Sequence, residues 1–301
     1  MFNSKDYLRY LCNTDKIKLK DFLKDEGVSA RFYREVTRES VILVNGDITR
    51  RNKTLYKGDE VLVKFPEENL NGEAQKGPFH ILYEDDDIIV VNKEPYMVTH
   101  TAKDNIDNTL LNYACYYFQE NDIKRKVRFA NRLDRDTSGI VILCKNAFAH
   151  ARISEQFEED TVVKNYVAAT KNNFKEKEGI IEEPIIRTED GIRRAVAEGG
   201  KYCKTGYSVI DESDDFAIVR LRLYTGRTHQ IRVHLQFIGC PIVGDTLYGE
   251  EDEKIKRQAL HCYYMEFDQP RTGKRLKIEA PLFDDMKSLV ENNWKSIPFK
   301  V

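Results

Sequence analysis

Residues 132–139 read RLDRDTSG and run directly into the apolar segment IVILC at 140–144. Thr-Ser-Gly is typical of a turn, which places the two acids of this stretch in a loop just before a buried strand. Asp134 has one arginine two residues before it and another directly after it. Positive neighbours favour the ionised carboxylate, the form that a nucleophile needs at neutral pH. The same arrangement also fits a structural ion pair, and these residues alone leave both interpretations open.

On either side of this loop, short β-rich runs alternate with turns and helical segments. We expect strands at residues 80–83, 88–92, 140–144, 164–170, 217–223, 259–267 and 275–280. Apolar periodicity predicts helices at residues 110–120, 147–158, 228–238 and 284–294. Because strands dominate without regular β-α-β alternation, we predict an α+β fold with a mixed, largely antiparallel sheet flanked by helices.

The first 65 residues predict a separate small module. A short apolar helix ends at Gly27, and Ser29 is placed to cap a second helix that reaches residue 40. A strand at 41–44, a hairpin turn at Asn45-Gly46 and a strand at 60–65 follow. This order of two helices, an αα-hairpin, and then a β-hairpin resembles the S4 domain, a small RNA-binding module.

The S4 resemblance sets the domain division that we expect. Residues 1–65 form the S4-like module, 66–79 a linker and 80–301 the catalytic domain; the linker is polar, without periodicity. Arg31, Arg34 and Arg38 share one face of the second helix, so the resemblance implies that they contact RNA. A docking module without RNA contact is the alternative.

Composition and charge narrow the class of protein. The chain of 301 residues has a formal net charge of −2 and is 41% hydrophobic and 33% charged, typical of a soluble globular protein. Lysines and arginines gather in residues 120–152 and 220–240, which suits local contact with a polyanion as well as an ordinary solvated face. The six cysteines form no CxxC pair, and no apolar signal or membrane-spanning segment is visible. We therefore expect a cytoplasmic protein.

Four motifs in register resemble the RluA family of pseudouridine synthases. RLDRDTSG at 132–139 is similar to the family signature HRLD-x-x-TSG. Residues 81–93, with ILYED and IIVVNK, resemble the opening strands of the family, and residues 164–168 resemble its K-x-Y-x-A strand. TGRTHQIRVHL at 225–235, with Asp245 and Tyr248 in the segment that follows, resembles its longest signature. The resemblance covers residues 80–283.

The resemblance implies the pseudouridine synthase fold and the isomerisation of uridine to pseudouridine in structured RNA. This reaction breaks the N1–C1′ bond, turns the uracil and joins C5 to C1′, so it implies no cofactor. Asp134 is the implied nucleophile, with attack on the sugar, attack on the ring and a glycal intermediate all open. Tyr166 is implied to stack near the target base and to act as a base; taken alone, it also fits a buried strand tyrosine. Arg232 is implied to orient Asp134 and keep it ionised.

Further residues of these motifs are expected to bind the RNA substrate. They are Asn131, Arg132, Arg135, Thr137, Lys164, Arg227, Thr228, His229 and Gln230. Asn131 stands where the family usually has histidine, which puts the identity of the substrate in doubt but not the reaction. His229 and His234 are five residues apart, a poor helical spacing for a shared metal ion, so we expect no metal site.

Two other classes of protein remain as alternatives. One is a non-catalytic RNA-binding or ribosome-assembly factor with the same fold, against which the joint presence of Asp134, Tyr166 and Arg232 argues. The other is a different S4-bearing enzyme, such as an RNA methyltransferase or a tRNA synthetase, but no G-x-G-x-x-G loop or HIGH-type signature is found. We expect the RNA to be ribosomal or transfer RNA, and the protein to be a monomer.

Overall fold

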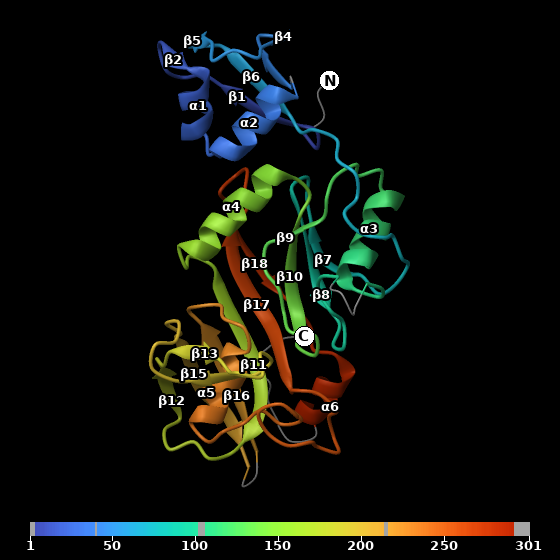
Figure 1. Cartoon of the computed structure of the whole chain (residues 1–301), viewed down its shortest axis with the longest axis vertical. Coiled ribbons are helices and arrows are strands. Elements are labelled where there is room, and N and C mark those ends of the chain that lie inside the picture. Colours follow the sequence, from blue (N-terminus) through green and yellow to red (C-terminus); the bar gives the residue numbers. More distant parts are fainter. Residues whose placement is uncertain (1–3, 40, 102–105, 214–215, 292–301) are drawn as a thin grey trace.

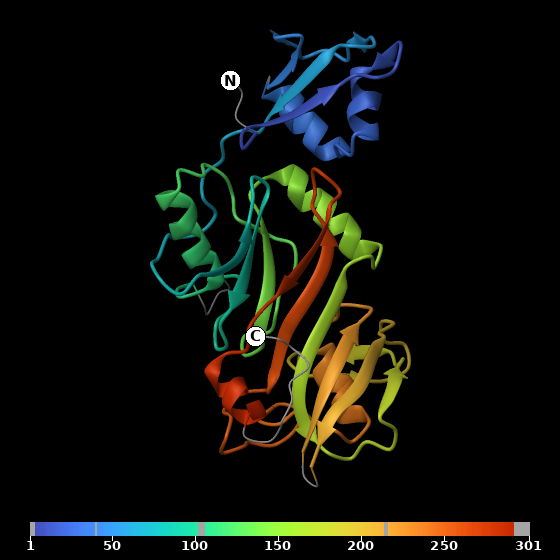
Figure 2. The same ribbon diagram turned by 180° about the vertical axis from the view of Figure 1, so that it is seen from behind.

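The computed structural model describes residues 4–39, 41–101, 106–213 and 216–291. They form a small N-terminal unit at one end of a larger body that is built around a long sheet (Figures 1 and 2). The predicted α+β class, with a mixed and mostly antiparallel sheet, is confirmed. Among the described residues, no helix has the length and apolar character needed to cross a membrane.

The N-terminal unit packs two helices against a sheet of order β1-β6-β3-β4. Its elements are β1 Tyr7–Leu11, β2 Ile17–Lys18, α1 Leu19–Asp25, α2 Ala30–Arg38, β3 Ile42–Val44, β4 Asp47–Ile48, β5 Thr54–Leu55 and β6 Glu60–Lys64. Ser29 begins α2 as predicted, because its hydroxyl accepts a hydrogen bond from the amide of Phe32 at 3.2 Å. Strand β1 was not predicted: of its residues only Leu8 is buried, and pairing with the distant β6 holds it in place.

The large sheet runs in the order β12-β15-β16-β11-β17-β10-β8-β7, with β18 beside β17 and β9 beside β10. Its strands are β7 His80–Glu84, β8 Ile88–Lys93, β9 Arg128–Phe129, β10 Ser138–Cys144, β11 Val163–Lys171, β12 Glu178–Ile181, β15 Thr205–Glu212, β16 Phe216–Leu223, β17 Leu260–Asp268 and β18 Arg275–Glu279. β13 Ile185–Arg187 and β14 Arg194–Val196 form a separate pair. Strand β10 pairs in parallel with β17 and is buried along its whole length, so it forms the centre of the core.

The larger body also contains four helices among its described residues: α3 Leu110–Glu120, α4 Ala147–Glu158, α5 Gln230–Phe237 and α6 Asp284–Glu291. α3 and α4 occupy the predicted residues, since the side chains of Thr109 and Asn146 cap their first turns. α5 was predicted from residue 228 but begins later, because His229 has a left-handed backbone with a φ of 57°. The predicted end of the last helix, at residue 294, lies outside the described residues.

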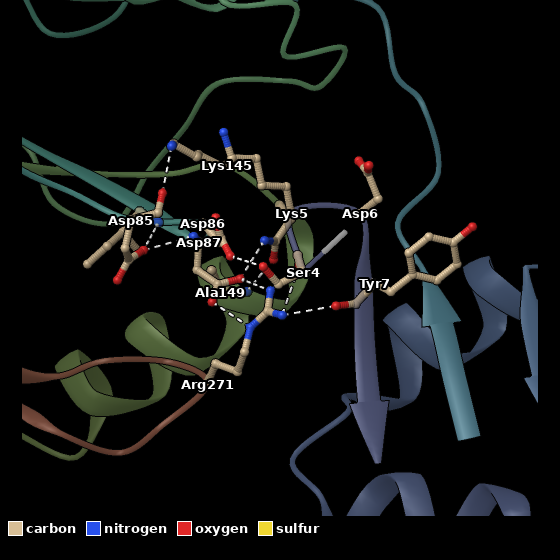
Figure 3. A network of polar contacts seen from close by, with 12 residues as sticks. Ser4, Lys5, Asp6, Tyr7, Asp85, Asp86, Asp87, Lys145, Ala149 and Arg271 are labelled. Carbon is tan, nitrogen blue, oxygen red and sulfur yellow. Dashed lines mark hydrogen bonds and ion pairs between the residues drawn. The ribbon is translucent and has the colours of Figure 1, made fainter. Parts of the chain in front are cut away.

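A partly buried arginine joins the N-terminal unit to the large sheet (Figure 3). Arg271, which follows β17, donates to the carboxylate of Asp87 from Nε at 2.8 Å and from Nη2 at 2.7 Å. Its Nη1 donates to the backbone carbonyls of Ser4 and Tyr7 at 3.0 and 2.9 Å. Asp87 is fully buried, so its charge depends on this cation for compensation. One guanidinium therefore links the large sheet to the strand that begins the N-terminal unit.

Aromatic packing reinforces this junction. Phe148, in the first turn of α4, is 3% exposed and packs into the core of the N-terminal unit. The ring of Phe65 has the guanidinium of Arg125 at 5.2 Å and that of Arg271 at 6.0 Å from its centre. The two units are thus in direct packed contact.

Residues 66–79, the predicted linker, contain no helix or strand, but hydrogen bonds hold them against the larger body. The side chain of Asn71 forms hydrogen bonds with both the carbonyl and the amide of Val127. Glu68 accepts two hydrogen bonds from Arg128 at 2.6 and 2.8 Å. This segment is laid along the larger body, and the division of the chain at residues 65 and 80 stays a prediction.

Candidate active site

A cavity of about 610 Å³ lies between the loop before β10, the start of β11 and the turn before α5. The site residues predicted in the large domain line it, apart from Arg135: they are Asn131, Arg132, Asp134, Thr137, Lys164, Tyr166, Arg227, Thr228, His229, Gln230 and Arg232. Arg135 is exposed and pairs with Asp136 at 2.9 Å. Arg31, Arg34 and Arg38 are exposed on α2, outside the cavity. The fold therefore brings three separate motifs to one place.

The loop that carries Asp134 is held through its backbone. The carbonyl of Asp134 accepts from the amide of Thr137 at 3.1 Å, which closes the predicted turn. Buried side chains donate to the neighbouring carbonyls: Thr99 to Leu133 at 3.3 Å, Lys93 to Arg135 at 3.0 Å and Arg257 to Asp136 at 3.0 Å. Because each carbonyl from residue 133 to 136 has a partner, the loop is fixed before any substrate binds.

The carboxylate of Asp134 faces Arg232. Arg232 Nη1 lies 3.3 Å from Asp134 Oδ2, and the two side chains are 8% and 22% exposed. Arg232 is oriented in turn by Asp245, which accepts from Nε at 2.7 Å and from Nη2 at 2.8 Å. Burial disfavours the charge of Arg232, but the hydrogen bonds and charge of Asp245, with the charge of Asp134, hold its pKa above the usual value. A permanently charged group thus meets Asp134 at a fixed angle.

Asp245 lies within the quoted motifs but was not predicted as a site residue. Its side chain is fully buried, and it also accepts from the amides of Leu247 and Tyr248 at 3.0 and 3.2 Å. The available signal was a lone acid at the end of the apolar run PIVGD at 241–245. A carboxylate in such surroundings requires a charged partner.

His229 lies on another side of the Asp134 carboxylate. Its Nε2 is 3.9 Å from Asp134 Oδ2, and its Nδ1 is 2.9 Å from the hydroxyl of Tyr248. Burial lowers the pKa of His229, an effect that the charge of Asp134 opposes and that of Arg232 reinforces. The imidazole is therefore neutral at neutral pH. Because the guanidinium of Arg232 also lies 5.0 Å from the ring centre of Tyr248, one tyrosine supports both neighbours of Asp134.

Tyr166 and Lys164 line the cavity from β11 and are 7% and 6% exposed. Burial raises the pKa of Tyr166 well above its usual value, and Cys262 and Asp134 add to this effect. Tyr166 is thus a neutral phenol at neutral pH. The ammonium of Lys164 lies 5.5 Å from the ring centre of Phe157, and burial lowers its pKa.

Several predicted binding residues use their side chains inside the protein. Asn131 pairs with the backbone of β10, donating to the carbonyl of Ile140 at 3.1 Å and accepting from the amide of Ile142 at 2.8 Å. Thr137 and Gln230 form hydrogen bonds with other buried side chains. These residues build the wall of the cavity, and their expected contacts with RNA stay predictions.

The chemical properties of the cavity follow from these contacts. Asp134 is paired with a cation yet open to the cavity, so its carboxylate can attack an electrophilic carbon of a bound molecule. Arg132 and Arg227 are exposed at the rim, where they suit phosphate groups. A tyrosine inside and arginines outside fit a nucleotide that has been drawn out of its helix.

The chain is similar to several known proteins. Residues 87–237 match a family model described as RNA pseudouridylate synthase. The chain is 35% identical over 277 residues to the uncharacterized RNA pseudouridine synthase YjbO of Bacillus subtilis, covering 91% of this chain and 98% of that protein. It is 35% identical over 270 residues to the ribosomal large subunit pseudouridine synthase D of Vibrio cholerae, covering 84% and 83%. The solved structure of human RNA Pseudouridylate Synthase Domain Containing 1 is similar with a TM-score of 0.58 and 28% identity, covering 69% of this chain and 86% of that one.

Proposed function

Since this chain belongs to the RluA family of RNA pseudouridine synthases, we propose that it isomerises uridine in large-subunit ribosomal RNA with Asp134 as the nucleophile. The enzyme is an isomerase. The N1–C1′ bond breaks, the uracil turns and C5 bonds to C1′, while N1 gains a proton and C5 loses one. Atoms and electrons balance without a redox partner.

The contact between Asp134 and Arg232 carries this proposal. Asp134 opens into the cavity, and Arg232 is prevented from turning away because Asp245 holds it with two hydrogen bonds. The carboxylate can add to C1′, add to the ring or assist the departure of the base toward a glycal. All three routes need the same ionised oxygen at the same place.

The other residues of the cavity have proposed roles that fit their surroundings. Tyr166 is proposed to stack on the target base; its raised pKa favours this role over that of a proton acceptor. Lys164, Arg132 and Arg227 are proposed to bind the phosphates on either side of the target nucleotide. His229, neutral and beside Asp134, is proposed to position the ribose or base by a hydrogen bond.

The substrate class is proposed from the relatives and from the surface of α2. The Vibrio cholerae relative is named for the large ribosomal subunit, which favours ribosomal RNA over transfer RNA. Arg31, Arg34 and Arg38 are exposed on α2 and are proposed to bind the RNA backbone. Arg31 is close enough to His150 on α4 to contribute to its lowered pKa, after the larger effects of burial and Arg128. The positive charge of Arg31 therefore lies close to α4.

The test is Asp134→Asn, which keeps the shape of the side chain and removes its charge. The variant should fold like the wild type and form no product above background on transcribed large-subunit ribosomal RNA. Pseudouridines are mapped by carbodiimide modification and primer extension.

Asp136→Asn is the matched control, because Asp136 lies in the same loop but its side chain pairs with the exposed Arg135. It should retain activity within about threefold. Product from Asp134→Asn at the wild-type rate would contradict the assignment of the nucleophile. Product found on transfer RNA but not on ribosomal RNA would contradict the substrate.

A further inference from the structure

Tyr96 holds a backbone conformation that tyrosine rarely adopts. Its φ is 62°, in the left-handed region, where Cβ lies too close to the following carbonyl oxygen. The non-glycine residues described with positive φ are Lys16, Asn45, Tyr96, Asn108, Asp122, Asp160 and His229. Asn and Asp tolerate this region because their short side chains bond locally. Larger residues there indicate strain, which concentrates at functional sites, and His229 stands beside Asp134.

Lys93 ties the turn that carries Tyr96 to the loop that carries Asp134. Lys93 is 1% exposed, and its ammonium donates to three backbone carbonyls. They are those of Glu94 at 2.8 Å, Met97 at 2.8 Å and Arg135 at 3.0 Å. Because an ammonium has three N–H donors, the group is saturated, and both segments share one buried anchor. Tyr96 therefore has a fixed position relative to the residue just before Arg135, which is Asp134.

The side chain of Tyr96 is exposed at this fixed position. The residue is 53% exposed, although the turn around it is anchored in the core. Burial is the largest cause that raises the pKa of its hydroxyl; Arg257 opposes this effect, and Asp285 and Asp136 add to it. The turn of Tyr96 lies beside the loop that carries Asp134, because the amino group of Lys93 binds the carbonyls of both Met97 and Arg135. Because the backbone on both sides of Tyr96 is already anchored, stacking of its ring on a ligand costs less conformational entropy.

Tyr96 does not line the cavity that contains Asp134. An exposed tyrosine alone is ordinary on a protein surface. Here two further observations coincide: a strained backbone and a buried anchor that the turn of Tyr96 shares with the loop of Asp134. A group that contacts Tyr96 therefore lies outside the cavity, next to the part of the same ligand that enters the cavity. Nucleotides adjacent to a flipped nucleotide meet this description.

We propose that Tyr96 is a stacking platform for the nucleobase next to the target uridine. This inference rests on the proposed function and extends it to the neighbouring nucleotide. When the uridine leaves its helix, one face of the adjacent base loses its stacking partner, and an aromatic ring at the rim replaces that partner. The side chain of Arg135 is 63% exposed in the same loop and lies where the intervening phosphate passes.

The test uses an RNA hairpin that contains the uridine modified in large-subunit ribosomal RNA, with 2-aminopurine at its 5′ or its 3′ neighbour. Stacking on the ring should quench the fluorescence of 2-aminopurine at one of the two positions with the wild type and with Tyr96→Phe, which keeps the ring. Tyr96→Ser should abolish this quenching and raise Kd about 5- to 150-fold, the range for loss of one base–aromatic stack. Turnover at saturating RNA should change by less than about threefold, because Lys93 and not Tyr96 anchors the catalytic loop.

Two further variants separate stacking from stability. Tyr96→Gly relieves the strained backbone, so it should melt at a higher temperature than the wild type while binding the hairpin as weakly as Tyr96→Ser. Phe237→Ser is the matched control: Phe237 is 52% exposed at the end of α5 and does not line the cavity. It should bind with the wild-type Kd.

Unchanged Kd and quenching in Tyr96→Ser would overturn the stacking platform. A raised Kd with unchanged quenching would overturn it as well, since the ring would then act without stacking. Failure of the proposed function looks different: the wild type itself would form no pseudouridine in ribosomal RNA, whatever residue 96 is.

Discussion

Asp245→Asn should release Arg232 from its orientation while it leaves the shape of the core unchanged. Asp245 Oδ1 accepts from Arg232 Nη2 at 2.8 Å and from the amides of Leu247 and Tyr248 at 3.0 and 3.2 Å, while Oδ2 accepts from Arg232 Nε at 2.7 Å. The oxygen of asparagine can replace Oδ1. Its amide nitrogen then faces Arg232 Nε, with one donor opposite another.

The magnitude follows from these contacts. One hydrogen bond to a charged group is lost, which costs about 1.5–3 kcal/mol, and a guanidinium that is only 8% exposed loses its closest counter-charge. We therefore expect the free energy of unfolding to fall by about 2–4 kcal/mol. Arg232 is then no longer held toward Asp134, and turnover should fall about 10- to 100-fold, which corresponds to ~1.4–2.7 kcal/mol of activation free energy.

Urea unfolding followed by circular dichroism measures the stability, and single-turnover reactions on ribosomal RNA measure the rate. Glu251→Gln is the control, because it removes an exposed acid from the loop that follows and should change neither quantity. A stability loss below about 0.5 kcal/mol together with wild-type turnover would show that the charge of Asp245 does not organise Arg232.

Phe148→Ala removes a ring that is 3% exposed and should destabilise the N-terminal unit by about 3–5 kcal/mol. Hydrogen exchange should accelerate in β6 but not in β10; equal protection in variant and wild type would contradict the docking. Acid should destabilise the protein through His261, because burial lowers its pKa from 6.5 to about 4. Between these values the unfolded state binds more protons, so this contribution is complete above pH 6.5 and falls by about 1.4 kcal/mol per pH unit toward pH 4. Urea unfolding at pH 7 and pH 5 checks this, and an unchanged slope in His261→Asn would assign it to other groups.

Local signals predicted the parts of the fold that depend on local chemistry. α3 and α4 begin where Thr109 and Asn146 provide caps, and both residues are visible in the sequence. Strands β1 and β12–β15 were missed because their residues are largely half-exposed, and β1 in addition pairs with β6, which is distant in the chain. A pattern of apolar residues does not report such pairings.

The motifs identified most of the residues that line the cavity, but they did not show in which direction each side chain points. Asn131 lines the cavity as expected, but the sequence did not show that its amide pairs with the backbone of β10, and its contact with the substrate stays a prediction. Asp245 was quoted without a role, because its pairing with Arg232 depends on how α5 is oriented against the following loop. Tyr96 carries no motif signal, since a φ of 62° is a property of the folded turn.

The contacts of Arg271 help to fix the distance between the N-terminal unit and the cavity. Its guanidinium binds both Asp87 and the carbonyls of Ser4 and Tyr7 at the start of the N-terminal unit. The distance from α2 to the cavity is therefore set by direct contacts and not by a flexible linker. If RNA binds both α2 and the cavity as proposed, its target uridine must lie at one set distance from the stretch that contacts α2. Inserting a base pair between the two points would rotate the uridine to another side of the duplex, beyond the reach of Asp134.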